Sequence, residues 1–178
     1  MKIPKSIFKA YDIRGIYKEE LTEKTSKFVA EALSRIYKEN NDTIIIGRDG
    51  RLSSKSLTKS LIEGFLESGK NVVDIGEVPT PLLYFAVNQL KSNSGVMVTG
   101  SHNPKNYNGL KIIMGGHALA GEEIQEIYKN ILGNKREAIN PKNSILENII
   151  IDEKYIDSVL KNIVINKKLK ISIDAGNG

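Results

Sequence analysis

A serine, a histidine and two lysines lie close together near the middle of the chain, in or just after a stretch of turn-forming residues between two short apolar runs. Ser101 and His102 follow the apolar run 95–98, and Lys111 belongs to the next apolar run, 110–113. A serine hydroxyl is a weak nucleophile unless a base or a strong electric field activates it. Loops that carry chemistry are commonly held by rigid elements. We therefore take the loop between the two runs as the candidate site.

The residue types of this loop suit phosphoryl transfer better than acyl transfer. The loop lacks the flanking glycines of the Gly-x-Ser-x-Gly nucleophile elbow of hydrolases. Phosphoryl transfer asks mainly for positioning and positive charge, and Lys105 and Lys111 supply that charge. Exposed N–H groups in a loop rich in Gly and Asn would add an anion-binding nest. The alternative, which local chemistry alone favours, is a solvated loop whose polar side chains bond to the backbone.

The composition excludes several other classes of site. The chain has 178 residues, of which 40% are hydrophobic and 26% charged, as in ordinary globular proteins. The net charge of +5 and the pI near 9.2 suit anionic ligands, but no dense basic cluster with interleaved aromatic residues points to nucleic acid. There is no cysteine, and His102 and His117 are too few for a histidine-built metal centre.

No signal peptide opens the sequence, and no apolar run reaches membrane-spanning length. We therefore predict a cytoplasmic protein with neither a membrane nor a nucleic acid as partner.

Apolar periodicity predicts alternating helices and strands around the loop. Thr22, Ser53 or Ser54, and Thr80 are the expected helix caps, with Pro81 at the first helical position. We expect helices over 22–37, 53–69, 80–90, 121–132 and 152–163, and strands over 43–46, 71–75, 95–98, 110–113 and 169–173, with a short extended piece at 149–151. The alternation predicts a layered α/β domain with a mostly parallel sheet. The turn at 114–117 indicates that one strand is antiparallel.

Two further segments carry charged residues that could serve the site. Residues 47–51, GRDGR, follow the predicted strand 43–46, and ligands of open α/β sheets bind at the carboxyl ends of strands. Arg48 and Arg51 would add positive charge there, and we interpret Asp49 as an arginine partner that stiffens the turn. Near the N-terminus, Tyr11 reads as a packing residue and Arg14 as a partner of Asp12.

Four motifs together resemble those of the alpha-D-phosphohexomutases. They are FKAYDIRG at 8–15, GRDGR at 47–51, VPTP at 78–81, and TGSHNP at 99–104 followed by NYNGLK at 106–111. The motifs occur in the family's order, and the resemblance covers essentially the whole chain. It implies a three-layer α/β/α domain with a mixed, mostly parallel sheet.

The resemblance also implies an activity, namely interconversion of the 1-phosphate and 6-phosphate of mannose or glucose. Ser101 would carry a phosphoryl group and pass it to the sugar, forming a bisphosphorylated intermediate. Arg14, His102 and Lys111 would surround the phosphoryl group, and Tyr11, Arg14 and Lys111 would contact substrate. A Mg²⁺ ion would bind through the phosphate of Ser101. Hexose phosphates and a hexose bisphosphate are the implied partners.

The sequence departs from the family's pattern in one respect. The family's Asp-Gly-Asp-Gly-Asp metal loop, its sugar-recognition loop and its distal phosphate site do not occur in these residues. We therefore expect 1–150 to form the phosphoserine domain and 151–178 to form a linker helix and the first strand of a second domain. The remaining domains would be partners, and the 178 residues alone would be inactive. The alternatives are a non-catalytic sugar-phosphate or anion-binding module and a scaffold without a ligand.

Overall fold

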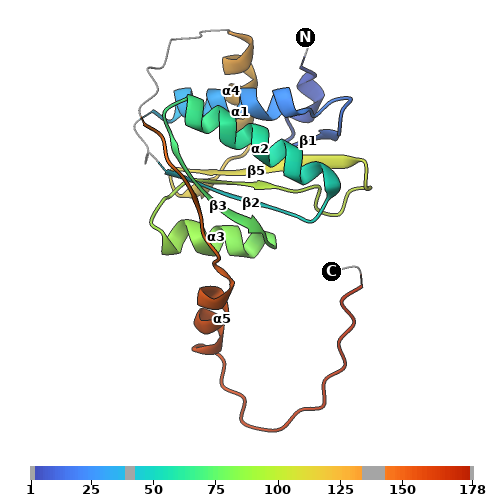
Figure 1. Ribbon diagram of the computed structural model, residues 1–178. Coiled ribbons are helices and arrows are strands. Elements are labelled where there is room, and N and C mark those ends of the chain that lie inside the picture. The colour runs from blue at the N-terminus through green and yellow to red at the C-terminus, as the bar shows by residue number, and fades with distance from the viewer. Residues whose placement is uncertain (1–2, 39–42, 134–142, 177–178) are drawn as a thin grey trace.

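The chain folds into a three-layer α/β/α domain, seen in a computed structural model that describes residues 3–38, 43–133 and 143–176. Figure 1 shows α1, α2 and α4 on one face of the sheet and α3 on the other. The helices are η1 Lys5–Ile7, α1 Glu23–Ile36, α2 Leu52–Glu67, α3 Thr80–Gln89, α4 Glu122–Leu132 and α5 Asp152–Leu160. The strands are β1 Ile13–Ile16, β2 Thr43–Arg48, β3 Asn71–Glu77, β4 Gly95–Val98, β5 Tyr107–Met114, β6 His117–Ala118 and β7 Leu146–Asn148.

The sheet is mixed, as the sequence predicted. Its order is β1-β5-β4-β2-β3-β7, with β6 paired to β5. The pairs β4–β2, β2–β3 and β3–β7 are parallel, whereas β5 is antiparallel to β1, β4 and β6. Among the described strands, β5 therefore runs alone against the other six. This reversal joins β4 to its neighbour β5 by a hairpin loop, residues 99–106, which contains Ser101.

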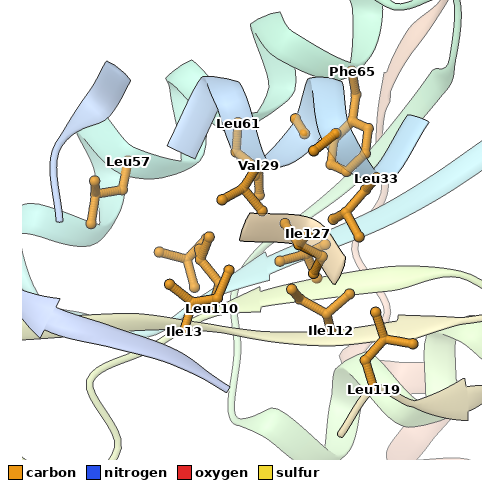
Figure 2. Close-up of a cluster of buried hydrophobic side chains, with 14 of the residues drawn as sticks. Ile13, Val29, Leu33, Leu57, Leu61, Phe65, Leu110, Ile112, Leu119 and Ile127 are labelled. Carbon is orange, nitrogen blue, oxygen red and sulfur yellow. The ribbon is translucent and has the colours of Figure 1, made fainter. Parts of the chain in front are cut away.

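The main core lies between the sheet and the layer formed by α1, α2 and α4. Figure 2 shows how side chains from all three helices meet those of β1 and β5. The labelled members are Ile13, Val29, Leu33, Leu57, Leu61, Phe65, Leu110, Ile112, Leu119 and Ile127. A second cluster, which includes Ile45, Leu83 and Met97, lies between α3 and the opposite face. The alternation of side chains along each strand thus fills one core on each face.

The helix caps differ in part from those predicted. Thr22 caps α1 as expected, accepting a hydrogen bond from the Thr25 amide at 3.2 Å. The N-cap of α2 is Arg51 rather than Ser53 or Ser54, and the N-cap of α3 is Pro79, so that Thr80 is already helical. The hydroxyls of Ser53 and Ser54 instead bond to side chains from other segments.

Two predictions near the C-terminus are wrong. The extended piece is β7, Leu146–Asn148, rather than 149–151, because β7 is the segment that pairs with β3. No strand forms over 169–173, where Leu169, Ile171 and Ile173 are largely exposed. A strand needs a neighbour for its backbone N–H and C=O groups, and the described part of the chain offers none here. Among the described residues, no helix is long and apolar enough to cross a membrane.

Replacing Phe65 by alanine should lower the free energy of unfolding by about 3–5 kcal/mol, because the ring is fully buried and its removal leaves a cavity. Urea denaturation of both proteins measures the difference. The control is Leu132→Ala, at a side chain that is 59% exposed on α4, and should cost less than about 1 kcal/mol. Equal losses at the two positions would contradict the core described above.

Candidate active site

Ser101 lies at the tip of the hairpin loop between β4 and β5. The Thr99 amide donates to the Gly109 carbonyl at 2.9 Å, so the sheet pairing extends to the base of the loop. Ser101 is exposed and adopts a left-handed backbone conformation, with φ of +52°. Residues other than glycine rarely adopt this conformation, and such strain concentrates at functional sites. The loop thus presents the serine hydroxyl to solvent on a strained backbone.

Among the described residues, His102 is the predicted site residue whose side chain reaches the Ser101 hydroxyl. Its Nδ1 lies 3.3 Å from the Ser101 hydroxyl oxygen. Both side chains are exposed, and which of the two atoms donates depends on the histidine tautomer. The arrangement allows a proton to pass between the imidazole and the serine oxygen.

Arg14 and Lys111 come together on the same face of the sheet, with Asp12 beside them. Arg14 lies opposite Gly109 in the β1–β5 pair, and Lys111 lies opposite Met97 in the β5–β4 pair. Leu110 and the other β5 side chains of opposite parity point into the main core, so the two cations point to the other face. There α3 packs mainly on β2 and β4, and the cations stay 25% and 33% exposed.

Asp12 is a residue that the sequence singled out only as a partner of Arg14, and the structure gives it a second cation. Its Oδ2 lies 2.5 Å from Arg14 Nη2 and 4.0 Å from Lys111 Nζ. The Asp12 side chain is only 8% exposed. The carboxylate therefore holds the two cations together near the base of the loop.

Tyr11 and His117 are not joined to this cluster. Tyr11 lies just before β1 and is 77% exposed, so its interpretation as a packing residue is wrong. Its expected substrate contact stays a prediction. His117 is an exposed residue of β6, where Nε2 pairs with Glu123 at 2.7 Å. His117 pairs with Met114 across the turn at Gly115 and Gly116, which agrees with its interpretation as an ordinary turn residue.

The two arginines of the GRDGR motif have different surroundings. Arg48 Nη1 lies 2.6 Å from Glu77 at an exposed position, so its charge is paired on the side of β3. Arg51 turns toward the Ser101 loop and donates to its backbone carbonyls. The expectation of positive charge near the site therefore applies to Arg51 and not to Arg48.

Asp49 connects the strand end of β2 to the Ser101 loop. Its Oδ2 accepts hydrogen bonds from the Thr99 hydroxyl at 2.9 Å and from the Gly100 amide at 3.0 Å. Its Oδ1 accepts from the Ser54 hydroxyl and from the Arg51 amide. Asp49 also pairs with Arg51 at 3.3 Å, as the sequence predicted, but the bonds to the loop were not foreseen.

Asn108 extends this network to β5. Its side-chain amide donates to the hydroxyls of Ser53 and Ser54 at 2.8 and 2.9 Å, and its oxygen accepts from the Gly109 amide. Asn108 is fully buried. The start of α2, the end of β2 and the start of β5 are thus joined beneath the loop through buried or half-buried polar groups.

Three amides of the loop are not free to take part in the expected nest. The Gly100 amide donates to Asp49, the Ser101 amide to the Thr99 hydroxyl at 2.9 Å, and the Asn103 amide to the Gly100 carbonyl at 3.0 Å. These N–H groups hold the loop's own shape. These three amides are therefore not available to bind an anion on Ser101.

A surface hollow of about 560 Å³ adjoins the loop. Its lining residues are Tyr17, Lys18, Gly50, Arg51, Leu52, Ser53 and Lys105. Lys18 and Lys105 are exposed at its rim. Positive charge therefore lies beside the loop in this direction as well.

The described residues do not by themselves supply a Mg²⁺ site. No group of three His, Asp or Glu side chains within 3–38, 43–133 and 143–176 is placed to hold a metal ion. The carboxylates of Asp12 and Asp49 are already engaged by cations and hydrogen-bond donors. Mg²⁺ favours several oxygen ligands in octahedral geometry. A metal ion on the phosphate of Ser101 would thus need ligands from outside these residues.

Asp49→Asn should weaken the acid dependence of stability. Burial opposes the charged form, but hydrogen bonds from Ser54, Arg51, Thr99 and Gly100 outweigh it and hold the pKa of the Asp49 carboxyl below its usual value. This contribution is fully present above the unfolded pKa of about 3.9, and is lost as the pH falls through the lower folded value.

Urea denaturation below about pH 5 measures this effect. The free energy of unfolding of Asp49→Asn should fall less steeply with acid than that of the unmodified protein. The control is Asp157→Asn, at an exposed carboxylate of α5. A profile for Asp49→Asn that runs parallel to the unmodified one would contradict the network.

Comparisons with known proteins agree with this geometry. The family described as phosphoglucomutase/phosphomannomutase, alpha/beta/alpha domain I, matches residues 5–138. A phosphomannomutase/phosphoglucomutase of Pseudomonas syringae is 44% identical over 99% of this chain, and a phosphoglucomutase of Neisseria meningitidis serogroup B is also 44% identical over 99%. The chain spans only 37% and 38% of these relatives' lengths.

Solved structures give the same result. A phosphoglucomutase/phosphomannomutase family protein from Burkholderia thailandensis superposes with a TM-score of 0.89 at 35% identity, covering 99% of this chain and 40% of that one. A structure described as a phosphomannomutase candidate from Thermus thermophilus gives a TM-score of 0.74 at 30% identity, covering 88% and 36%. The chain therefore belongs to the phosphoglucomutase/phosphomannomutase family, whose alpha/beta/alpha domain I it contains.

Proposed function

We propose that this chain is the phosphoserine-bearing part of a phosphohexomutase, an enzyme that interconverts hexose 1-phosphate and hexose 6-phosphate. One observation carries the proposal: Ser101 is exposed on a strained hairpin tip, at the base of which Arg14 and Lys111 gather around Asp12. The names of the relatives supply the substrate class, with mannose and glucose phosphates as the candidates.

In the proposed reaction, Ser101 carries a phosphoryl group on its side-chain oxygen. A sugar hydroxyl attacks the phosphorus, the bond from phosphorus to the serine oxygen breaks, and that oxygen keeps the electron pair. His102, 3.3 Å from the serine oxygen, is the group placed to exchange a proton with it. The product is a hexose bisphosphate. After the sugar reorients, the serine oxygen attacks the phosphorus of the other phosphate, and the bond from that phosphorus to the sugar oxygen breaks. The sugar oxygen leaves with the electron pair and takes up a proton, so that the hexose monophosphate is released and the phosphoserine is restored.

Arg14 and Lys111 serve this reaction as fixed positive charge. Phosphoryl transfer depends mainly on positioning and on electrostatic stabilisation of the transferring group. Asp12 neutralises part of the charge of the two cations, but it also keeps two like charges close together. The pair therefore keeps a net positive charge on the partly open sheet face. Tyr11 completes the proposed substrate contacts as an exposed aromatic ring.

The proposal includes a Mg²⁺ ion that would bind through the phosphate of Ser101. When bound, the ion would neutralise charge on the phosphoryl group. The described residues lack the carboxylates for a complete site. We propose that residues 1–150 form the phosphoserine domain and that 151–178 begin the connection to further domains, which would contribute those ligands. Hexose phosphates, a hexose bisphosphate and these domains are the proposed partners, and a cytoplasmic location stays a prediction.

Ser101 should carry the phosphate, and Ser101→Ala should abolish turnover while leaving the fold intact, because an exposed loop serine contributes little packing. Peptide mapping of the protein with the family's remaining domains, purified from cells, locates the phosphate. A coupled mutase assay compares Ser101→Ala, Arg14→Ala and Lys111→Ala with Lys59→Ala, an exposed lysine of α2.

We expect no turnover for Ser101→Ala, a loss of about 100-fold or more for the two cation variants, and unchanged turnover for Lys59→Ala. Phosphate found on another serine with Ser101 unmodified, or wild-type rates for Ser101→Ala, would disprove the phosphoserine assignment. A phosphate-free protein that binds hexose phosphates without turnover would instead indicate a non-catalytic binding module.

The 178 residues alone should fold but not catalyse. The two cores are complete within the described residues, whereas no metal cluster is present among them. Circular dichroism and a coupled assay with Mg²⁺ and a hexose bisphosphate test the chain alone beside the multidomain protein. Comparable turnover in both would refute the proposed division of roles between domains.

A further inference from the structure

Arg51 lies against the Ser101 loop and donates hydrogen bonds to four backbone carbonyl groups. Nη1 donates to Pro104 at 2.7 Å and to Tyr107 at 3.1 Å, and Nη2 donates to Asn103 at 2.6 Å and to Ser101 at 3.1 Å. Nε faces Asp49 Oδ2 at 3.3 Å. All three guanidinium nitrogens are therefore engaged, and the side chain is only 18% exposed. Its planar fork of five N–H donors is what allows so many partners.

Gly100 shows how closely the guanidinium packs against the loop. A Cβ atom at this position would lie 2.3 Å from Arg51 Nε and 2.4 Å from Cζ. The nearest atoms belong to a planar group with hydrogen bonds on all sides, so they cannot move aside freely. The contact therefore requires glycine at position 100, although its backbone conformation does not.

Asp49 and Arg51 bond to complementary groups of the loop. Asp49 accepts from the Thr99 hydroxyl and the Gly100 amide, which precede Ser101, whereas Arg51 donates to carbonyls of Ser101 and the residues after it. Ser101, between these two sets of bonds, has the left-handed φ of +52°. A strained residue persists only when its surroundings over-determine its conformation. Asp49 and Arg51 therefore fix the backbone on both sides of Ser101.

We infer that Arg51 is a positioning residue of the phosphoryl-transfer reaction. It holds Ser101 in its left-handed conformation and thereby aims the serine oxygen, without touching the phosphoryl group. This inference rests on the proposed function. The N–H groups of Arg51 already donate to backbone carbonyl groups, so Arg51 acts by holding the loop. It differs in this from Arg14 and Lys111, whose charges are proposed to face the phosphoryl group.

Arg48 provides a matched control. It carries the same charge three residues earlier in the same motif, but it pairs with Glu77 and makes no described bond to the Ser101 loop. A general loss of positive charge at this end of the sheet would affect Arg48 and Arg51 variants alike. A loss of loop geometry would affect only Arg51.

The test combines steady-state kinetics and amide hydrogen exchange in the multidomain protein, with Arg51→Gln, Arg51→Lys, Gly100→Ala and Arg48→Gln. For Arg51→Gln we expect kcat to fall about 100-fold, as for a misplaced reacting group, while KM changes less than about threefold because Arg51 does not touch the sugar. In the same variant, the amide hydrogens of Gly100 and Asn103 should exchange faster than in the unmodified protein. Arg51→Lys should not restore kcat, because one ammonium group cannot span four carbonyls.

Gly100→Ala should lower kcat in the same way with Arg51 present, which keeps the test decisive if Arg51→Gln does not fold. Arg48→Gln should match the unmodified protein in both measurements. The inference is overturned if Arg51→Gln keeps kcat, if the change appears in KM alone, or if Arg51→Lys restores full activity. If the unmodified protein shows no mutase activity, the proposed function is refuted instead. Amide hydrogen exchange then still tests the role of Arg51 in the loop: faster exchange in Arg51→Gln but not in Arg48→Gln supports it, and equal exchange in the two variants refutes it.

Discussion

The ion pair between Asp49 and Arg51 is the interaction on which the geometry of the Ser101 loop depends. A half-buried ion pair gains little unless further hydrogen bonds satisfy the lone pairs and protons that the partners do not use on each other. Here the loop backbone provides those bonds, with amide and hydroxyl donors for Asp49 and carbonyl acceptors for Arg51. The pair and the loop therefore stabilise each other, and neither arrangement would be favourable alone.

The direction of β5 determines what kind of phosphate site can form. In a parallel α/β unit, a strand is followed by a loop and a helix, whose free N-terminal amides bind phosphate. Here β4 is followed by the antiparallel strand β5, so no helix begins after Ser101. The amides of Gly100, Ser101 and Asn103 are also used within the protein. Side chains supply positive charge instead, and Arg14 on β1 and Lys111 on β5 lie beside Gly109 and Met97, a few residues from the ends of the loop.

Sequence patterns predicted the elements better than the partners of individual side chains. The helix over 121–132, the cap at Thr22 and the antiparallel strand depend on local residues and were predicted correctly. The strand expected at 169–173 did not form, because strand formation depends on a neighbouring strand, which local sequence does not reveal. Ser101 and His102 are adjacent in sequence, but only the structure shows that the imidazole lies 3.3 Å from the serine oxygen. The contacts of Arg51 span about fifty residues of sequence, so only the fold could show that this arginine binds the loop carbonyls.

The charges around Ser101 bear on the proposed phosphoserine state. Arg14 and Lys111 share the carboxylate of Asp12, and Arg51 pairs with Asp49, so these five groups together have a net charge of +1. A phosphoserine at Ser101 would bring roughly −1.5 to −2 charges at pH 7. The five groups alone would therefore not balance it, and the donors of Arg51 are already bonded to loop carbonyl groups. The remaining positive charge would have to come from the exposed side chains of Lys18 and Lys105, or from the metal ion proposed above. Exposed lysines are screened by solvent and salt, so a bound cation would be the stronger of these two sources.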